Sequence, residues 1–562
     1  MKKSTGAILI VLLLAGATAV YFIFLRPKPG ISPSHIESAE KLFGLEITPE
    51  ERKMMLPGLQ QYKSSYERLR ETNISNQVTP ALYFDPVPAG ANPGPSRQNF
   101  IFDPDKPVEM PDHFEELAFY PVSDLARLLY QKKITSLQLT HLYLDRLREY
   151  GDSLECVITL TEDLALRQAE KADREIAAGR WRGPLHGVPW GAKDLLATKH
   201  IPTTWGAMPY KDQVFDYDAT VVQRLEEAGA VLVAKLAMGA LAMGNVWYQG
   251  STRNPWDIEQ GSSGSSAGSA AATAAGLVGF SIGTETYGSI VSPSSRCGVT
   301  GLRPTFGRVS RYGAMALSWS MDKIGPIGRT AEDCALVFQA IYGPDSRDIT
   351  VKDIPFNWEP DRGLSDLTIG YLEPAFDQGE DERKYDQAVL DVLRGHGVEL
   401  VPFSLPDIPV EAMSFILMVE AAAAFDELTR SGKDDLLVRQ TRGSWPNLFR
   451  QARMIPAVEY IQANRLRTLL IQKMAEKMKE VDVYVAPSFY GSSNLLLTNL
   501  TGHPAVVLPN GFDDEGRPLS ITFTGNLYQE GQVLRAAHAY QQATFFHLQH
   551  PDAAGQIKNK TE

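Results

Sequence analysis

Hydrophobic positions follow two different periods between residues 113 and 550, which predicts one large globular region. Residues 125–147 hold eight leucines, several of them three or four positions apart, the spacing that lines one face of a helix, and residues 164–178 also favour a helix. Short apolar runs at residues 230–234 and 277–282 are typical of buried strands. Helices that alternate with short buried strands predict an α/β fold in which helices surround a sheet.

The first thirty residues differ from this region. Residues 6–25 are apolar or small without interruption, lysines precede them, and Arg26 ends the run. A run of this length can span a bilayer as a helix, although Ala-Thr-Ala at residues 17–19 also suits a cleaved signal peptide. Because the apolar run continues past that site to Leu25, we favour an uncleaved anchor over a cleaved signal, and both over a buried core helix. We expect the body of the protein to lie outside the cytoplasm, membrane-anchored or exported.

Residues 31–112 predict an N-terminal extension that is helical first and proline-rich afterwards. A helix is expected over residues 34–45, and Thr48 with Glu51 forms a T-x-x-E capping box before another. Eight prolines between residues 79 and 112 then predict an extended strap or linker. The chain is therefore expected to divide into four parts: an anchor or signal segment at residues 1–30, this extension, a globular domain at residues 113–550 and a polar tail at residues 551–562.

Composition narrows the choice of partners and cofactors. The chain has 562 residues and a net charge of −12, which disfavours a nucleic-acid partner because such partners need a basic surface. The three cysteines, Cys156, Cys297 and Cys334, are scattered without a C-x-x-C pair, and the ten histidines include no H-x-x-x-H pair. We therefore expect buried thiols without a disulfide framework, no bound metal and no cofactor.

A serine- and glycine-rich segment at residues 261–276 is the first candidate for chemistry. Its composition is that of a flexible linker, but its alanines favour a helix over residues 269–275, and a buried strand is expected directly after it. Residues 264–268 also match G-x-S-x-G, the turn that carries the nucleophile of α/β-hydrolases. That turn needs a preceding strand, whereas residues 253–257 are expected to form a turn, so this second interpretation is disfavoured.

A longer set of motifs gives the segment a different interpretation. Residues 283–293 read Gly-Thr-Glu-Thr-Tyr-Gly-Ser-Ile-Val-Ser-Pro, and further motifs lie at residues 183–189, 193–194, 298–305, 307–310, 322–330, 499–505 and 509–512. Together these closely resemble the amidase-signature family over about residues 115–550. The resemblance implies the fold of that family, an α/β fold with a large mixed, mostly central β-sheet covered by helices. It also implies that the protein is an amidase.

The resemblance assigns roles to three residues. By position in the motifs, Ser289 is the nucleophile, Ser265, in a cis peptide, is the relay, and Lys193 is the base. These residue types suit the chemistry because a serine hydroxyl needs an adjacent base and a lysine is a base only when neutral. An ordinary lysine pKa leaves about one molecule in 10³ neutral at pH 7, and burial among apolar neighbours would lower that pKa. The implied reaction is hydrolysis of a carboxylic amide, and by the same route an ester, through an acyl-enzyme.

The turn before Ser289 is expected to stabilise the oxyanion. The backbone N–H groups of Thr286, Tyr287 and Gly288 in this turn would donate hydrogen bonds to the oxyanion. The side chains of Ser266 and Thr286 would form hydrogen bonds in the site. The sequence departs from the usual family pattern at Tyr287, at Val291, where many members have arginine, and at residues 519–522. These departures leave the substrate class open. Four charged residues are expected to hold loops rather than to react: Asp194, Glu285, Arg303 and Asp322.

Two other functions stay open. The glutaminase subunit of a tRNA-dependent amidotransferase has a similar sequence, but a cytoplasmic location with partner subunits fits poorly with the apolar N-terminus and the extension. A membrane-tethered binding protein without turnover is the second, and the intact Lys193, Ser265 and Ser289 argue against it. The expected partners are a small-molecule amide substrate and, through the N-terminal segment, a membrane, with a homodimer as one option.

Overall fold

The computed structural model describes residues 30–44, 46–69, 71, 75–78, 82, 84–88, 90–376, 383–488 and 491–552. The apolar run of the predicted anchor and the polar tail after Asp552 lie outside this part. No helix within the described ranges is both long and apolar enough to cross a membrane. The chain divides into a small unit, residues 1–75 with 454–456, and a large unit that holds the remaining residues.

Two helices make up most of the described part of the small unit: α2, Pro33–Phe43, and α3, Pro49–Leu69. The capping box before α3 is confirmed, because the Glu51 N–H donates to Thr48 Oγ1 at 3.3 Å and the Thr48 N–H donates to Glu51 Oε2 at 2.7 Å. Arg52 joins the helices, since its Nε donates to Glu40 Oε2 at 3.0 Å.

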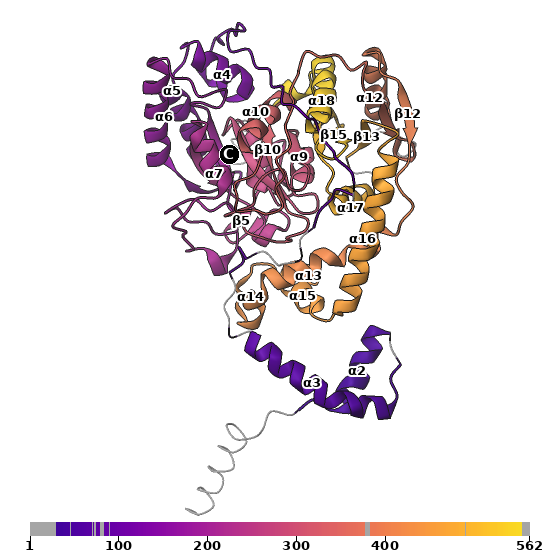
Figure 1. Ribbon diagram of the computed structural model, residues 1–562. Coiled ribbons are helices and arrows are strands. Elements are labelled where there is room, and N and C mark those ends of the chain that lie inside the picture. Colours follow the sequence, from indigo (N-terminus) through magenta and orange to yellow (C-terminus); the bar gives the residue numbers. More distant parts are fainter. Residues whose placement is uncertain are drawn as a thin grey trace, which may run out of the picture. The chain divides into compact units, whose positions relative to one another are not determined.

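An eleven-stranded sheet forms the centre of the large unit (Figure 1), in the order β1-β3-β2-β8-β10-β9-β14-β15-β13-β11-β12. The sheet is mixed: β2 pairs in parallel with β3 and β8, β11 pairs in parallel with β12 and β13, and the other pairs are antiparallel. The predicted fold class is therefore confirmed. The strands are β1 Val157–Leu160, β2 Pro189–Lys193, β3 Val231–Leu236, β8 Phe280–Glu285, β9 Thr300–Arg303, β10 Lys323–Gly328, β11 Ile369–Leu372, β12 Leu400–Phe403, β13 Val483–Pro487, β14 Ala505–Phe512 and β15 Pro518–Gly525.

Helices pack on this sheet, with α6 against β3, α8 against β2 and β8, and α18 against β14 and β15. The helices are α4 Val122–Tyr130, α5 Ser136–Tyr150, α6 Glu162–Ala177, α7 Thr220–Glu227, α8 Ala267–Ala274, α9 Val291–Cys297, α10 Ala331–Ile341, α11 Glu373–Phe376, α12 Arg383–Gly395, α13 Phe415–Ala424, α14 Asp426–Arg430, α15 Trp445–Ala452, α16 Ala457–Lys477, α17 Gly491–Thr501 and α18 Glu530–Thr544. Thr135 caps α5 by accepting a hydrogen bond from the Gln138 N–H, so the leucine pattern of α4 and α5 is confirmed as two helices.

Two local predictions need correction. The strand expected at residues 277–282 begins later, as β8, because Gly276 adopts a φ of +67° and the Leu277 N–H closes the end of α8 on Ala272 O at 2.8 Å. The turn expected at residues 253–257 is present at residues 255–256, but it joins two short strands, β6 Arg253–Asn254 and β7 Asp257–Gly261, so a strand does precede residues 264–268. This hairpin is separate from the central sheet, as is the pair β4 Val246–Trp247 and β5 Gly250–Ser251.

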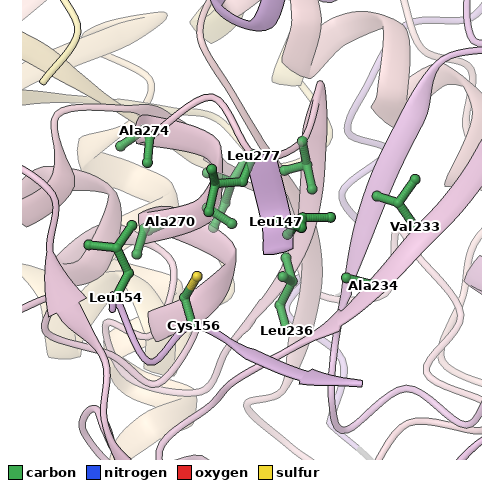
Figure 2. Packing of buried hydrophobic residues seen from close by; sticks show 14 of the residues in the cluster. Leu147, Leu154, Cys156, Val233, Ala234, Leu236, Ala270, Ala274 and Leu277 are labelled. Carbon is green, nitrogen blue, oxygen red and sulfur yellow. The ribbon is translucent and has the colours of Figure 1, made fainter. Parts of the chain in front are cut away.

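The alanine-rich helix α8 is part of a buried hydrophobic cluster that also contains Leu236 and Leu277 (Figure 2). Every residue of α8 is buried. A Cβ at Gly268 would come within 2.4 Å of Cys156 O, so only glycine permits α8 to lie this close to the backbone at Cys156. The serine- and glycine-rich segment is therefore a packed element, and the linker interpretation is wrong. All three cysteines of the sequence are free and buried, as predicted.

Candidate functional site

A buried lysine surrounded by hydroxyl groups lies at the centre of the candidate site. Lys193 is the last residue of β2, and its side chain is completely buried. Its Nζ lies 2.8 Å from Ser265 Oγ, 3.0 Å from Ser266 Oγ and 2.9 Å from Thr284 Oγ1. Because β2 and β8 are parallel neighbours, their carboxyl ends meet at one edge of the sheet, which brings Thr284 of β8 to the lysine.

The surroundings of Lys193 favour its neutral form. Burial lowers the pKa of the Lys193 ammonium from its ordinary value to about 7, against the opposing effect of the Asp322 and Glu285 charges. Within the described ranges no carboxylate lies close enough to Lys193 to form an ion pair. Lys193 is therefore neutral at pH 7 far more often than an ordinary lysine, of which about one molecule in 10³ is neutral.

The serine pair reaches the lysine from the segment that leads into α8. The Gly264–Ser265 peptide bond is cis, and Ser266 is the N-cap of α8. Ser266 Oγ donates to Thr284 O and accepts from the Thr284 N–H, each at 3.1 Å. The Ser266 N–H donates to Ser289 O at 3.1 Å. These bonds hold the serine pair against β8 and against the turn that carries Ser289.

The turn with Thr286, Tyr287, Gly288 and Ser289 connects β8 to α9. Gly288 has a φ of +89°, in the region that favours glycine, and a Cβ there would lie 3.0 Å from Leu495 Cδ2. Ser289 is only 7% exposed. The structure thus brings Lys193, Ser265 and Ser266 into direct contact and ties Ser289 to Ser266 through the backbone.

Glu285 holds the end of the turn that carries Ser289. Its carboxylate accepts the N–H groups of Ile290 and Val291 at 2.9 Å each, and it also accepts Arg303 Nη1 at 2.9 Å and Asn499 Nδ2 at 2.8 Å. Burial alone would raise the pKa of Glu285, but the Arg303 charge and the backbone donor lower it to about 2. Arg303 thus forms a buried ion pair with the carboxylate that binds the Val291 N–H.

Asp322 holds the other side of the turn. Its Oδ1 accepts the Thr286 hydroxyl at 2.6 Å, and its Oδ2 accepts the N–H groups of Leu317 and Ser318 at 2.8 and 2.9 Å. Burial raises the pKa of Asp322. Together with Glu285, this carboxylate fits the expectation that both groups hold loops.

Asp194, next to the candidate base, forms a completely buried ion pair with Lys235 of β3 at 3.1 Å. Asp194 Oδ2 also accepts the Thr204 N–H at 2.8 Å, and Lys235 Nζ donates to Thr203 Oγ1 at 2.8 Å and Leu196 O at 3.0 Å. The ion pair and these hydrogen bonds hold the segment that follows β2 in place, as expected for Asp194.

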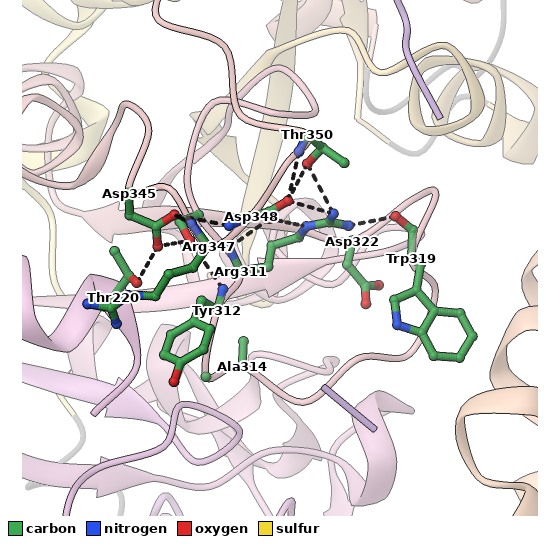
Figure 3. Close-up of polar contacts among 12 residues, drawn as sticks. Thr220, Arg311, Tyr312, Ala314, Trp319, Asp322, Asp345, Arg347, Asp348 and Thr350 are labelled. Atoms are coloured by element: carbon green, nitrogen blue, oxygen red, sulfur yellow. Dashed lines mark hydrogen bonds and ion pairs between the residues drawn. The ribbon is translucent and has the colours of Figure 1, made fainter. Parts of the chain in front are cut away.

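A pocket of about 60 Å³ adjoins the lysine, since Thr284 and Thr286 line it. Figure 3 shows part of the polar lining, in which Arg311 pairs with Asp348 at 2.9 Å and donates to Trp319 O at 2.7 Å. The remaining wall includes apolar side chains and two residues of the N-terminal extension: Leu195, Ala242, Ala314, Met315, Ala316, Leu317, Ile324, Asn76 and Gln77. Within the described ranges, no three His, Cys, Asp or Glu side chains gather as metal ligands.

Three features of the site were missed by sequence reasoning. Thr284 contacts Lys193 only because two strands distant in sequence are parallel neighbours. Lys323 of β10 is buried in the pocket wall, and burial with the Arg303 charge lowers its pKa well below the ordinary value. Asn76 and Gln77 lie in the predicted N-terminal extension, just before its proline-rich part, and no sequence pattern marks them as pocket residues.

Comparisons of sequence and fold relate this chain to known proteins. The model of the family described as Amidase matches residues 138–495. The A subunit of glutamyl-tRNA(Gln) amidotransferase from Coxiella burnetii is 32% identical over 477 residues, covering 76% of this chain and 98% of that protein. The corresponding protein from Trichormus variabilis is 34% identical over 482 residues, 76% of this chain and 99% of that protein. The native peptide amidase from Stenotrophomonas maltophilia has a similar structure, with a TM-score of 0.69 and 30% identity over 76% of this chain and 97% of that chain.

Proposed function

The chain belongs to the amidase signature family of hydrolases that act on carbon–nitrogen bonds, and from this premise we propose that it cleaves a carboxylic amide through an acyl-enzyme on Ser289. In this proposal Lys193 is the base and Ser265 relays the proton. The observation that carries it is the completely buried Lys193 amine, 2.8 Å from Ser265 Oγ and without a carboxylate partner in the described part of the chain.

The neutral amine is the energetic basis of the mechanism. Moving the Lys193 pKa from 10.5 to about 7 disfavours the ammonium by roughly 5 kcal/mol. Folding buries Lys193 and thereby imposes this penalty on the ammonium, so the neutral base is present before the substrate binds. The hydroxyl oxygens around Nζ orient the amine without neutralising a charge.

The proposed reaction begins when the Ser289 hydroxyl attacks the amide carbonyl. The Ser289 proton passes to Ser265, whose own proton passes to Lys193. The backbone N–H groups of Thr286, Tyr287 and Gly288 face the developing oxyanion in this proposal. Collapse of the tetrahedral intermediate breaks the C–N bond, and the proton returns from Lys193 through Ser265 to the leaving amine. Water then attacks the ester of Ser289 with the same base and releases the acid.

Labelling by a fluorophosphonate probe tests the proposal directly. The full-length protein should react covalently with the probe, and Ser289→Ala should abolish the reaction. Ser431→Ala, at an exposed serine, is the matched control and should label as the parent does. A panel of amides and esters then gives the substrate class. Folded parent protein that neither labels nor hydrolyses any member of the panel would contradict the proposal and favour a binding protein without turnover.

A glutaminase that serves a tRNA-dependent amidotransferase is the second candidate function. It is favoured by the similarity to the two amidotransferase proteins over 98–99% of their length. Glutamine hydrolysis that appears only when candidate partner proteins are added would support this alternative. Hydrolysis of simple amides by the chain alone would favour the first proposal.

We also propose that the protein acts at or beyond a membrane. The uninterrupted apolar run of residues 6–25 and the basic residues beside it support this location. A C-terminal reporter that is active only in the cytoplasm should be silent in cells, and an active reporter would contradict the proposed location.

A further inference from the structure

Asn76 and Gln77 lie in the N-terminal extension, yet both line the pocket beside Lys193. They are outside residues 138–495, which the family model matches. The shared part of the sequence therefore does not supply this portion of the pocket wall. The contacts of the two side chains indicate what they do there.

The two side-chain amides bind the backbone of residues 313–316, which we name the pocket loop. Ala316 N–H donates to Asn76 Oδ1 at 2.7 Å, and Asn76 Nδ2 donates to Ala316 O at 2.9 Å. Gly313 N–H donates to Gln77 Oε1 at 3.2 Å, and Gln77 Nε2 donates to Ala314 O at 2.8 Å. Each amide thus pairs with one donor and one acceptor of the loop, as a neighbouring strand would.

The other side of the pocket loop is bound to the chain that follows Lys193. Met315 N–H donates to Leu195 O at 3.0 Å, and Ala197 N–H donates to Gly313 O at 2.9 Å. Leu195, Ala314, Met315 and Ala316 all line the pocket. The loop is therefore held between the extension and the segment that follows β2, and three of its residues form part of the pocket wall.

The same contacts lead to the turn that carries Ser289. Directly after the pocket loop, the N–H groups of Leu317 and Ser318 donate to Asp322, which accepts the Thr286 hydroxyl at 2.6 Å. A displaced pocket loop would change the pocket wall directly. It would affect the turn that carries Ser289 only through Asp322. We expect binding of substrate to respond more than the chemical step.

We propose that Asn76 and Gln77 are specificity-determining residues: they hold the pocket loop in place and so limit the size of the substrate group that the pocket admits. This inference rests on the proposed amidase function, and it deepens it by assigning part of the substrate selectivity to the N-terminal extension. The two residues position the wall and take no part in the chemistry.

The test compares the parent protein with Asn76→Ala/Gln77→Ala on two series of amides, one graded in the size of the acyl group and one in the size of the amine. For the smaller substrates we expect KM to rise about tenfold with kcat changed less than threefold, because four hydrogen bonds to the loop are lost. In one of the two series, the ratio of kcat/KM for the bulkiest to the smallest member should rise about tenfold or more.

Asn99→Ala is the matched control, because Asn99 lies in the same extension, and its side chain donates to Glu359 at 2.6 Å, outside the pocket lining. Asn99→Ala should leave the ratio of kcat/KM for the bulkiest to the smallest member unchanged in both series. The single variants Asn76→Ala and Gln77→Ala provide the same comparison if the double variant does not fold. Unchanged ratios in a folded variant, or an equal fall of kcat for all substrates, would overturn the inference. A parent protein without turnover and without Ser289 labelling would instead overturn the proposed function.

Discussion

Lys193 and Lys235 stand on neighbouring strands, β2 and β3, and both side chains are completely buried. Burial lowers the pKa of each. They differ in their partners: Lys193 is surrounded by the hydroxyls of Ser265, Ser266 and Thr284, whereas Lys235 forms an ion pair with Asp194 at 3.1 Å.

The difference separates a reactive lysine from a structural one. A carboxylate at ion-pair distance stabilises the ammonium of Lys235 and thereby opposes the effect of burial. Hydroxyl oxygens orient the Lys193 amine without a counter-charge, so burial prevails and a neutral base becomes available near pH 7. Substitutions at the two positions should therefore affect different properties of the protein.

The largest expected effect is that of Lys193→Met on activity. Removing the proposed base should lower kcat/KM about 10⁴-fold or more. The thermal unfolding midpoint should stay constant or rise, since the substitution also removes an ammonium that burial disfavours by roughly 5 kcal/mol. Kinetics on the best amide of the panel and thermal unfolding measure the two properties. A fall of the unfolding midpoint with retained activity would reverse the assignment of the two lysines.

Lys235→Met should produce the opposite pattern. The substitution leaves the buried carboxylate of Asp194 without its ion pair, which destabilises a protein by about 3–5 kcal/mol. We expect a lower unfolding midpoint, with kcat/KM measured on the folded fraction changed much less than in Lys193→Met. Asp194→Asn/Lys235→Met is the control: it removes the unpaired charge and should recover much of the lost stability. Equal midpoints in Lys235→Met and the parent would show that the ion pair does not stabilise the fold.

The pH dependence of activity should report the ionisation of Lys193. Because the base is protonated below its pKa of about 7, kcat/KM should fall about tenfold per pH unit below 7 and level off above it. Stability should change in the same direction: between about 7 and 10.5 the unfolded chain binds a proton that the folded Lys193 does not, so folding becomes more favourable as pH rises. Lys193→Met should lose this contribution, and a flat activity profile from pH 5 to 8 would contradict the proposed base.

The contact of Lys193 with Ser265 and Ser266 could be anticipated from the ordered motifs, because those motifs place all three residues in one family pattern. Much of the fold could also be predicted, since the leucine period marks α4 and α5 and the apolar run marks β3. The sheet order could not, because pairings such as β9 with β14 join strands about 200 residues apart and leave no local pattern.

The same reason explains what was missed in the site. Asn76 contacts Ala316 across 240 residues of sequence, and an amide that binds backbone groups has no sequence period. The start of β8 was misplaced for a local reason, since the left-handed Gly276 ends α8 and displaces the strand. Long-range hydrogen bonds and single backbone conformations are therefore what the structure adds to the motifs.

Thr284→Val makes the smallest change and tests the role of the hydroxyl groups around Lys193. Valine keeps the shape of threonine but removes the oxygen 2.9 Å from Nζ, an oxygen that stabilises the ammonium by accepting its hydrogen bond. We expect kcat/KM to fall about three- to tenfold and the midpoint of its pH profile to move below that of the parent, because the charged form loses a partner. Thr140→Val, in the buried face of α5, is the matched control, since the Thr140 hydroxyl has no hydrogen-bond partner in the described part of the chain. A midpoint that moves upward in Thr284→Val would contradict this role, because it would mean that the Thr284 hydroxyl stabilises the neutral amine.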